Sequence, residues 1–410
     1  MRSGYPEIQY LANRRACSGN DFWSGLLALE SSDNPMNTSS LRLIQVVAQL
    51  KPSRCGVSDQ ALLLARELES AFGIDTGFVI LNSAEECVSH FPQIHCDPAH
   101  LLESCISLSE GKPGAILVHY SGYGYSADGA PKLLADGIER VRRSGQFRIG
   151  TYFHELYAVG MPWRSAFWHT QRQKSVARRI ARGCDLVVTN LNYHADWLER
   201  KALSGVVTPL KRLPVFSNVG EKRELAPMSA RRPVVAVFGL PGTRKRSYQR
   251  LAHLESMLAT LGVVEILDIG PEFEAPSGLR GVPVKRMGVL SAEEIAIVLA
   301  RTMFGFVPNA PFCLAKSSIL ACFCALGTIP VLAESFSGEI DGLSDGVQVV
   351  SPRTAKAALD SGLERCSASA WRWYSGHRLH IHAGTYAHLL FNSSPEAGAI
   401  APAIAAFAER

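Results

Sequence analysis

The chain has 410 residues, of which 47% are hydrophobic and 19% are charged. This length predicts two domains, and this composition excludes an intrinsically disordered protein. The formal net charge of +5 permits an anionic substrate or an acidic membrane surface, but it does not indicate a nucleic acid partner.

Residues 1–38 have no clear apolar periodicity and contain clusters of Asn, Ser, Asp and Gly. We expect a poorly ordered N-terminal extension, and the second methionine, Met36, leaves open whether the native start lies there. The ten cysteines form no CxxC pair and no zinc-type spacing, so we expect no metal site and a reducing, cytoplasmic location. No run of about 20 apolar residues occurs, so no transmembrane helix is predicted.

From residue 41 onward, apolar strand-like runs alternate with helical segments. The first predicted strand covers residues 41–47, and a helix over 58–70 follows it after a turn. Further strands are predicted over 76–81, 115–118, 148–153 and 185–188. This alternation is typical of a parallel sheet covered on both faces, and it predicts a first Rossmann-like domain over residues 39–213.

A polar, proline-containing segment then interrupts the pattern, and we assign residues 214–231 to a linker. A second series of strands and helices predicts a second domain over residues 232–375. Its strands are predicted over 233–239, 264–269, 305–307 and 329–333, and its helices over 248–261, 292–301 and a segment that opens with serine and closes at Gly327. We expect the helices of residues 376–410 to pack back on the first domain.

The predicted fold class is therefore α/β, with two tandem Rossmann-like domains whose doubly wound parallel sheets face a cleft. In such sheets, ligands bind beyond the carboxyl ends of the strands. The cleft between the two domains is the predicted active site.

The turn between the first strand and the first helix contains Gly56, where the missing Cβ lets backbone approach a ligand. Ser58 or Asp59 is expected to cap the helix, whose N-terminus would face the cleft. The segment is neither GxGxxG nor a P-loop, so a dinucleotide or ATP site gains little support. A purely structural turn is the alternative.

His154 and Glu155 stand at the end of a predicted strand, which places them at the mouth of the cleft. An imidazole there can bind a sugar hydroxyl or stabilise developing charge. We therefore predict His154, Glu155 and Gly56 as the catalytic residues, although a lone histidine is more often structural.

Aromatic residues near the same edge predict an acceptor site. Tyr123 and Tyr125 lie on a loop that interleaves Gly with Tyr after a strand, and Trp163 lies in an aromatic segment further on. Their faces and hydroxyls suit a sugar or another polyol. Ordinary packing of these side chains is equally compatible with the pattern.

A basic segment in the second half predicts part of a diphosphate site. Gly239 follows a buried strand and allows close backbone approach, and Arg244 and Lys245 come shortly after it. Arg offers a bidentate fork and Lys a compact charge to a phosphate. A solvated basic turn is the alternative.

A helix N-terminus predicts the rest of that site. Lys316, Ser317 and Ser318 stand where a helix offers unpaired N–H groups and the positive end of its dipole. We expect them to converge with the Gly239 segment on one donor diphosphate, although they also fit one more ordinary α/β unit. A cationic helix over 171–182 fits either a solvated surface or a contact with anionic lipid.

The order of these motifs resembles a GT-B glycosyltransferase. It is most similar to retaining family 4, the "glycosyl transferases group 1" type, over roughly residues 40–390. The resemblance rests on the order of the Gly56 loop, the strand-end His154, the linker with residues 216–220, the Gly239 loop and the Gly327-Thr328 turn. It implies transfer of a sugar from a nucleotide-sugar, with UDP- or GDP-sugar favoured, to a glycan, lipid-linked or small-molecule acceptor.

The resemblance also implies retention of the anomeric configuration and no metal ion or cofactor. In that family an Arg and a Lys hold the donor diphosphate, which matches Arg244 and Lys245. The glycine loop that approaches the transferred sugar matches Gly56, and the histidine that contacts the sugar matches His154. The chain contains no Asp-x-Asp pair, in agreement with charge neutralisation by cations and helix N-termini.

The sequence departs from the family at its two glutamates, which fall on Leu314 and Cys322. Lys316 and the two serines lie between these positions and offer another way to hold the donor. Two alternatives therefore stay open: a non-catalytic glycan- or nucleotide-binding protein of the same fold, and a nucleotide-sugar epimerase. Peripheral contact with the inner face of a membrane is also left open.

Overall fold

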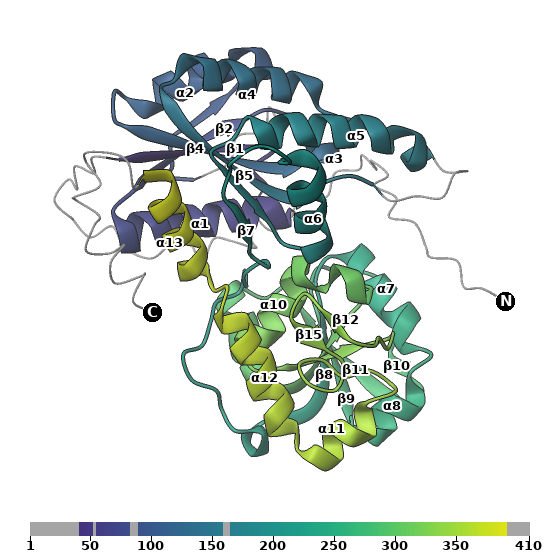
Figure 1. The fold of residues 1–410 in the computed structure, drawn as a ribbon. Helices are drawn as coiled ribbons and strands as arrows, with labels where there is room; N and C mark the ends of the chain where they lie inside the picture. The colour runs from purple at the N-terminus through teal and green to yellow at the C-terminus, as the bar shows by residue number, and fades with distance from the viewer. Residues whose placement is uncertain (1–40, 52–54, 83–88, 159–164, 392–410) are drawn as a thin grey trace, which may run out of the picture.

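The computed structural model describes residues 41–51, 55–82, 89–158 and 165–391. The expected N-terminal extension and Trp163 lie outside these residues. The chain forms two α/β lobes, one above the other in Figure 1, each built around its own sheet. This is the two-domain architecture that the alternation of strands and helices predicts.

The first lobe contains a seven-stranded parallel sheet in the order β3-β2-β1-β4-β5-β6-β7. Its strands are β1 (Arg42–Val47), β2 (Asp75–Ile80), β3 (Gln93–His95), β4 (Gly114–Ser121), β5 (Phe147–Glu155), β6 (Leu186–Thr189) and β7 (Leu210–Arg212). The five strands predicted here are confirmed to within a few residues. The patterns of β3 and β7 are too short to be recognised, since each has three residues.

Helices cover both faces of this sheet. Leu43 and Leu117 on one face pack on α1 (Gly56–Phe72) and α13 (Leu379–Phe391). Ile44 and Val118 on the other face pack on α2 (Leu101–Ser109), α4 (Lys132–Ser144) and α5 (Ser165–Arg182). Because successive strand residues point to opposite faces and helices cover both faces, the central strands are mainly apolar, as expected for a doubly wound sheet.

Shorter helices complete the first lobe. They are η1 (Pro98–His100), α3 (Gly122–Tyr125), α6 (Asn192–Trp197) and the π-helical turn η2 (Leu198–Ala202).

The second lobe contains a six-stranded sheet in the order β10-β11-β9-β8-β12-β13, parallel except for β10 with β11. Its strands are β8 (Arg232–Phe238), β9 (Glu265–Ile269), β10 (Gly278–Leu279), β11 (Val282–Gly288), β12 (Thr302–Val307) and β13 (Ile329–Leu332), and β14 (Glu339–Ile340) and β15 (Leu343–Ser344) form a separate hairpin. The four strands predicted here are confirmed.

The helices of the second lobe begin after the short turn η3 (Met228–Ala230). They are α7 (Pro241–Leu251), α8 (Glu255–Thr260), α9 (Ala292–Ala300), η4 (Pro311–Lys316), α10 (Ser318–Ala325), α11 (Ala355–Ser361) and α12 (Leu363–Ser375).

Two local predictions are wrong. The single helix predicted over 248–261 is two helices, because α7 ends at Leu251 and α8 begins at Glu255. Pro241 occupies the first turn of α7, so the basic segment after Gly239 is the start of that helix. The helix α1 has no side-chain cap. Ser58 instead exchanges hydrogen bonds with Lys51 N and Gln49 O in the preceding loop, each at 3.0 Å.

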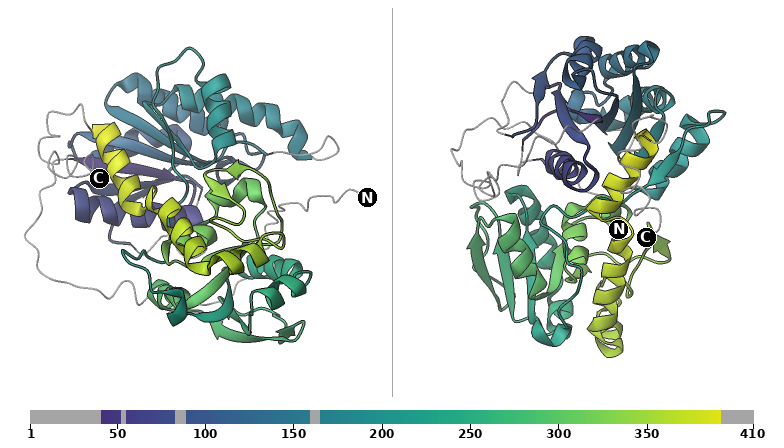
Figure 2. Two further views of the ribbon diagram at one scale, coloured as in Figure 1. Left: turned by 60° about the horizontal axis from the view of Figure 1, so that its bottom comes forward. Right: turned by 90° about the vertical axis from the view of Figure 1, so that its left-hand side faces the viewer.

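The end of the described chain returns to the first lobe. Both views of Figure 2 show α12 on the second lobe and α13 on the first. His380 at the start of α13 stacks on Phe72 at 5.2 Å between ring centroids, and its Nδ1 lies 2.8 Å from Glu67. Within the described residues, no helix is both long enough and apolar enough to cross a bilayer.

Candidate functional site

The two lobes meet where the carboxyl ends of β5 and β12 face each other, and we call this place the interdomain junction. Glu155 ends β5, and Lys316 ends η4 in the segment after β12. Lys316 Nζ lies 3.1 Å from Glu155 Oε1, so an ion pair joins the lobes. Two residues predicted from separate motifs thus lie in contact.

The helix α10 begins beside this ion pair. Ser317 is its N-cap, and its hydroxyl accepts from Leu320 N at 3.3 Å and donates to Asn309 Oδ1 at 3.1 Å. The cap fixes the orientation of the first turn, which starts at Ser318. The first N–H groups of a helix have no intrahelical acceptor, so this terminus can bind an anion.

Gly239 lies next to the same terminus. Its φ of 126° is rarely adopted by residues with a side chain, so glycine is required there. A Cβ at this position would lie 3.5 Å from Ile319 Cδ1, in the first turn of α10. The turn from β8 into α7 and the start of α10 therefore adjoin.

The basic pair of α7 is divided between two environments. Arg244 is 1% exposed, and its guanidinium bonds to Asp268 and to Pro271 O and lies over the Phe273 ring. Lys245, the next residue of α7, is exposed. The sequence contains no sign of this difference between adjacent cations.

His154 begins a chain of hydrogen bonds that crosses three neighbouring strands. Its Nε2 lies 3.1 Å from His119 Nδ1 on β4, and His119 Nε2 lies 2.7 Å from Gln45 Oε1 on β1. Gln45 Nε2 donates to Ala61 O at 3.0 Å. All three side chains are buried on the sheet face that packs on α1 and α13.

This chain of hydrogen bonds fixes the tautomers. The amide of Gln45 faces His119 with its oxygen, so His119 Nε2 donates and His119 Nδ1 carries the lone pair. His154 Nε2 then donates to His119, which leaves His154 Nδ1 as a hydrogen-bond acceptor. Burial holds the pKa of His154 well below its usual value and lowers the pKa of His119 to about 3. Both rings are neutral near pH 7.

Gly56 opens α1, in an ordinary helical position. A Cβ there would meet no atom of the described residues within 4 Å, so the space above it is open with respect to them. The geometry is compatible with the approach of a ligand.

The two described tyrosines of the predicted acceptor site differ. Tyr123 is 42% exposed, and its hydroxyl accepts from Gln173 Nε2 at 3.0 Å. The Tyr125 hydroxyl donates to His119 O at 2.9 Å and Val46 O at 3.1 Å, and burial raises its pKa. Tyr125 therefore supports the strand that carries His119.

The two positions at which the resemblance would place glutamates are buried. Leu314 and Cys322 are both 0% exposed. The Cys322 thiol donates to Asn218 Oδ1 at 3.1 Å, and Asn218 Nδ2 donates to Asp59 Oδ2 at 3.4 Å. Burial raises the pKa of Cys322 to about 11. This cluster connects the linker to both lobes.

Several junction residues are not found by the sequence prediction. Gln45 carries a signal, because it is a polar residue inside an apolar strand, and His119 stands in a motif that the sequence singles out. Asn192 N donates to Asp341 Oδ1 at 2.7 Å between the lobes, but the two residues are 149 positions apart. No local pattern relates such a pair.

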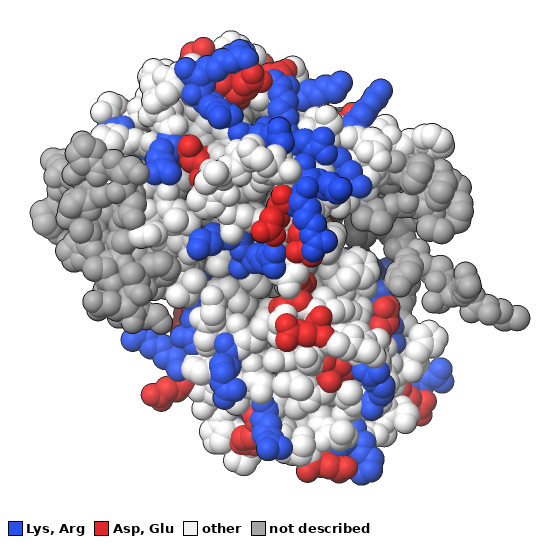
Figure 3. Space-filling model, in the orientation of Figure 1, with Lys and Arg blue, Asp and Glu red and all other residues white. Residues whose placement is uncertain are grey.

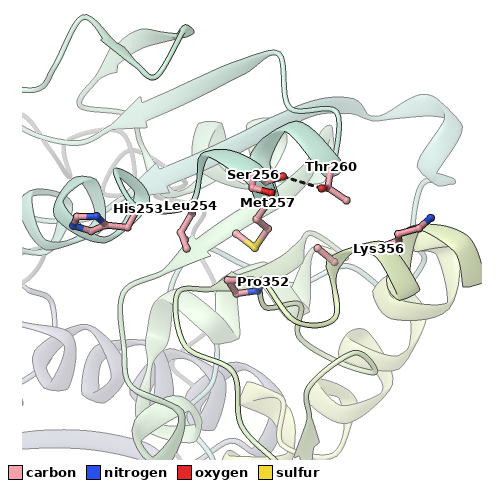
Figure 4. A pocket seen from close by; sticks show the side chains of 8 residues that line it. His253, Leu254, Ser256, Met257, Thr260, Pro352 and Lys356 are labelled. Atoms are coloured by element: carbon pink, nitrogen blue, oxygen red, sulfur yellow. Dashed lines mark hydrogen bonds between the residues drawn. The ribbon is translucent and has the colours of Figure 1, made fainter. Parts of the chain in front are cut away.

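The described residues contain no group of three or more His, Cys, Asp or Glu side chains that could hold a metal ion. A cavity of about 160 Å³ lies in the second lobe between α8 and the start of α11. Figure 4 shows His253, Met257, Pro352 and Lys356 around it, and no predicted site residue takes part.

The sequence matches no protein-family model and no curated protein. Solved structures are similar in fold. Sucrose-phosphate synthase from Thermosynechococcus elongatus has 13% identity and a TM-score of 0.54 over 85% of this chain and 98% of that chain. An α,α-trehalose-phosphate synthase (UDP-forming) from Burkholderia vietnamiensis has 14% identity and a TM-score of 0.52, over 88% and 98%.

An α-glucosyltransferase solved with UDP and DNA has 10% identity and a TM-score of 0.50, over 82% of this chain and 95% of that chain. At these identities the likeness concerns the fold alone. The chain has the two-domain, Rossmann-like GT-B fold, as the order of its motifs predicts.

Proposed function

We propose that this chain is a glycosyltransferase that moves a sugar from a nucleotide-diphosphate sugar to an acceptor. The observation that supports the proposal is the ion pair between Lys316, next to the α10 terminus, and Glu155 across the interdomain junction, where Glu155 directly follows His154 on β5. A cation and a helix N-terminus suit a diphosphate, and a strand-end imidazole and carboxylate suit a sugar.

In this proposal the departing diphosphate lies against Lys316 and the first N–H groups of α10. Charge that develops on the leaving oxygen is stabilised by these fixed donors, without a metal ion. Ser317 acts by orienting the terminus, and Ser318 supplies the first backbone donor. Gly239 lets the diphosphate approach the adjoining turn.

His154 Nδ1 accepts a hydrogen bond from a hydroxyl of the transferred sugar. The chain of hydrogen bonds from His154 through His119 to Gln45, which we call the relay, holds the His154 ring in the required tautomer. Glu155 pairs with Lys316 until the donor displaces it, and Gly56 leaves room for the sugar. We further propose retention of the anomeric configuration.

Of the two predicted cations on α7, we assign Lys245 to the diphosphate and Arg244 to support. The Arg244 guanidinium donates to Pro271 O and so stabilises the turn after β9, which lies beside Gly239. Lys245 is exposed, and in this proposal its ammonium group binds a phosphate of the donor.

We propose a UDP- or GDP-sugar as donor. Two proteins of similar fold support this choice, since one is a UDP-forming synthase and the other was solved with UDP. The acceptor is a glycan, a lipid-linked glycan or a small molecule, bound near Tyr123 and the segment with Trp163. We propose a cytoplasmic location with peripheral membrane contact, and the eight described cysteines, all free thiols, are compatible with it.

Thermal unfolding of the purified chain with UDP, GDP, ADP or dTDP tests the donor site, first with EDTA and then with magnesium. A ligand at about 100 times its Kd adds about 2.7 kcal/mol of stability. We expect one diphosphate to raise the Tm in EDTA. Lys316→Gln should weaken that ligand by about tenfold or more, since it removes a charge-assisted hydrogen bond.

Lys356→Gln is the matched control, because Lys356 is exposed on α11 and pairs with Asp360 on the same helix. It should bind the diphosphate as the wild type does. Absence of a shift with all four nucleotides would remove the donor site from the proposal.

A second candidate is a binding protein without turnover. The burial of Leu314 and Cys322 favours it, because no carboxylate stands at either position. A Tm shift with a nucleotide diphosphate, combined with no release of that diphosphate from its sugar derivatives, would decide for this candidate.

A further inference from the structure

The positive charge of the chain is concentrated in one segment. Residues 165–212 contain nine Lys and Arg but only three Asp and Glu, whereas the whole chain has a formal net charge of +5. The rest of the molecule is therefore close to neutral. The segment contains α5, α6 and η2, which pack together in the first lobe.

Part of this charge is held within the protein. Arg179 pairs with Asp136 and Glu139 of α4. Arg212 lies 3.1 Å from Asp196 and 3.4 Å from Glu199. The Arg182 guanidinium donates to two backbone carbonyls, Ala202 O and Ser204 O. These contacts serve the packing of the lobe.

Arg200 of η2 lies 4.0 Å from Asp196. Four cations of α5 and η2 then remain, namely Arg172, Lys174, Arg178 and Lys201. None of them forms an ion pair with a carboxylate in the part of the chain that the structure describes. Figure 3 shows the blue side chains gathered over the region of α5 and α6, with few red ones among them.

Three of these cations share a cavity of about 460 Å³. The cavity lies between α5 and η2 and is lined by Gln171, Lys174, Ser175, Arg178, Trp197 and Lys201. Ser and Gln add neutral donors to the three charged ones, and Trp197 adds an aromatic wall. This combination suits a phosphate group attached to an organic body.

One aromatic residue connects the cavity to the interdomain junction. Tyr157 follows Glu155 by two positions, and the centroid of its ring lies 4.5 Å from Lys174 Nζ and 5.3 Å from that of the Trp197 ring. The centroid of the His194 ring lies 6.2 Å from that of Tyr157. The cavity is thus one side chain away from the end of β5.

We propose that this cavity binds the phosphate group of an anionic acceptor. The proposal rests on the proposed function and names the acceptor's class, a phosphate ester. Lys174, Arg178 and Lys201 hold the phosphate, and Tyr157 and Trp197 contact the body of the acceptor between the phosphate and the junction. A soluble sugar phosphate and the phosphate of a lipid headgroup share this chemistry.

Two probes separate these sources with the full chain. Calorimetric titration with glucose 6-phosphate, against glucose as the uncharged reference, tests a soluble phosphate. Flotation with phosphatidylcholine vesicles, with and without phosphatidylglycerol, tests a lipid phosphate. The variant Arg178→Gln/Lys201→Gln removes two of the three cations. The variant Arg365→Gln/Arg372→Gln removes the same charge from α12 and is the control.

We expect one probe to bind, and the cavity variant to weaken it by about tenfold or more, because each lost contact is charge-assisted. The α12 variant should bind like the wild type. Glucose 6-phosphate binding assigns a soluble acceptor, and binding only to anionic vesicles assigns a lipid-linked one. Binding of neither probe, or equal binding by both variants, overturns the proposal.

The thermal unfolding test of the nucleotide site is independent of the binding test of the cavity. The cavity variant should keep the Tm shift with the nucleotide diphosphate, because Lys316 and α10 are unchanged. If no nucleotide binds but glucose 6-phosphate does, the cavity assignment stands and the transferase proposal fails.

Discussion

Each lobe buries a cluster of polar side chains near the strand ends that face the junction, and the two clusters differ in charge. In the first lobe, Gln45, His119 and His154 form a neutral relay. In the second lobe, Arg244 and Asp268 form a charged pair, and the Tyr248 hydroxyl donates to Asp268 Oδ2 at 2.7 Å.

The clusters also differ in what they leave for a ligand. The relay ends at His154 Nδ1, which has a lone pair to offer. The pair in the second lobe directs the Arg244 guanidinium inward, to Asp268, Pro271 O and the Phe273 ring. A position after a strand end therefore does not make a residue a ligand, because its buried partners decide which donors remain.

The largest effect should follow from breaking the charged pair. Asp268→Asn leaves Arg244 charged and uncompensated, and it places an amide N–H₂ near a tyrosine donor. Removal of one partner of a buried ion pair costs about 3–5 kcal/mol. We expect a loss of that size in the free energy of unfolding, measured by urea denaturation.

An exposed pair on the first two strands of the same sheet is the control. Arg232 lies 2.8 Å from Glu265, with 57% and 21% of their side chains exposed. Glu265→Gln should change the free energy by about 0–1 kcal/mol. Equal losses in the two variants would mean that the Arg244–Asp268 pair adds no more stability than an exposed pair. Arg244 would then again be a candidate for binding the diphosphate.

The sequence predicts the larger part of the fold. Strand runs such as 41–47 and 233–239 are mainly apolar and lead into turns that contain glycine and proline, so their approximate limits follow from composition. The placement of Lys316 and Glu155 toward one cleft follows from the rule that ligands bind beyond the carboxyl ends of the strands. The ion pair between them is not predicted, because the two residues belong to different sheets. Short strands such as β10 and β15, with two residues each, carry no periodicity.

The sequence does not predict which way a polar side chain turns. Arg244 and Lys245 are adjacent and alike in charge, but helical geometry directs the first toward β9 and the second to solvent. The pattern predicts Tyr125 for the acceptor, but its hydroxyl is occupied by two carbonyls of neighbouring strands. These outcomes depend on residues distant in the sequence.

A second prediction compares the first β–α turn of each lobe. Gly239→Ala forces a side chain into a φ of 126°, which costs about 1–3 kcal/mol. The new methyl of Gly56→Ala meets no atom of the described chain within 4 Å, so this variant should leave the free energy of unfolding nearly unchanged. Urea denaturation of both variants measures the difference.

The Gly56→Ala variant also tests whether Gly56 belongs to the donor site. Gly56→Ala should fold normally and still weaken binding of the donor sugar, since the new methyl occupies the open space above the turn. If Gly56→Ala binds the nucleotide-sugar as the wild type does, Gly56 has no role in the site.

The third prediction concerns pH and the neutral relay. Burial lowers the pKa of His119 to about 3, below the value near 6.5 in an unfolded chain. Between these values the unfolded state binds a proton that the native state does not, so stability falls as the pH falls from about 6.5 toward 3. Each such histidine contributes a slope of up to about 1.4 kcal/mol per pH unit.

His119→Asn removes one titrating group from the relay, so its free energy of unfolding should fall less steeply on acidification, by about 1.4 kcal/mol per pH unit. Urea denaturation at several pH values between about 6 and 4 measures this slope, which is independent of any constant loss caused by the substitution. His253→Asn, at an exposed position of the second lobe, should keep the wild-type slope.

If His119→Asn also kept the wild-type slope, His119 would be protonated in the native state over this pH range. It would then donate from both nitrogens, so His154 Nε2 would have to accept and Nδ1 would carry the proton, which is the opposite of what the proposed sugar contact requires.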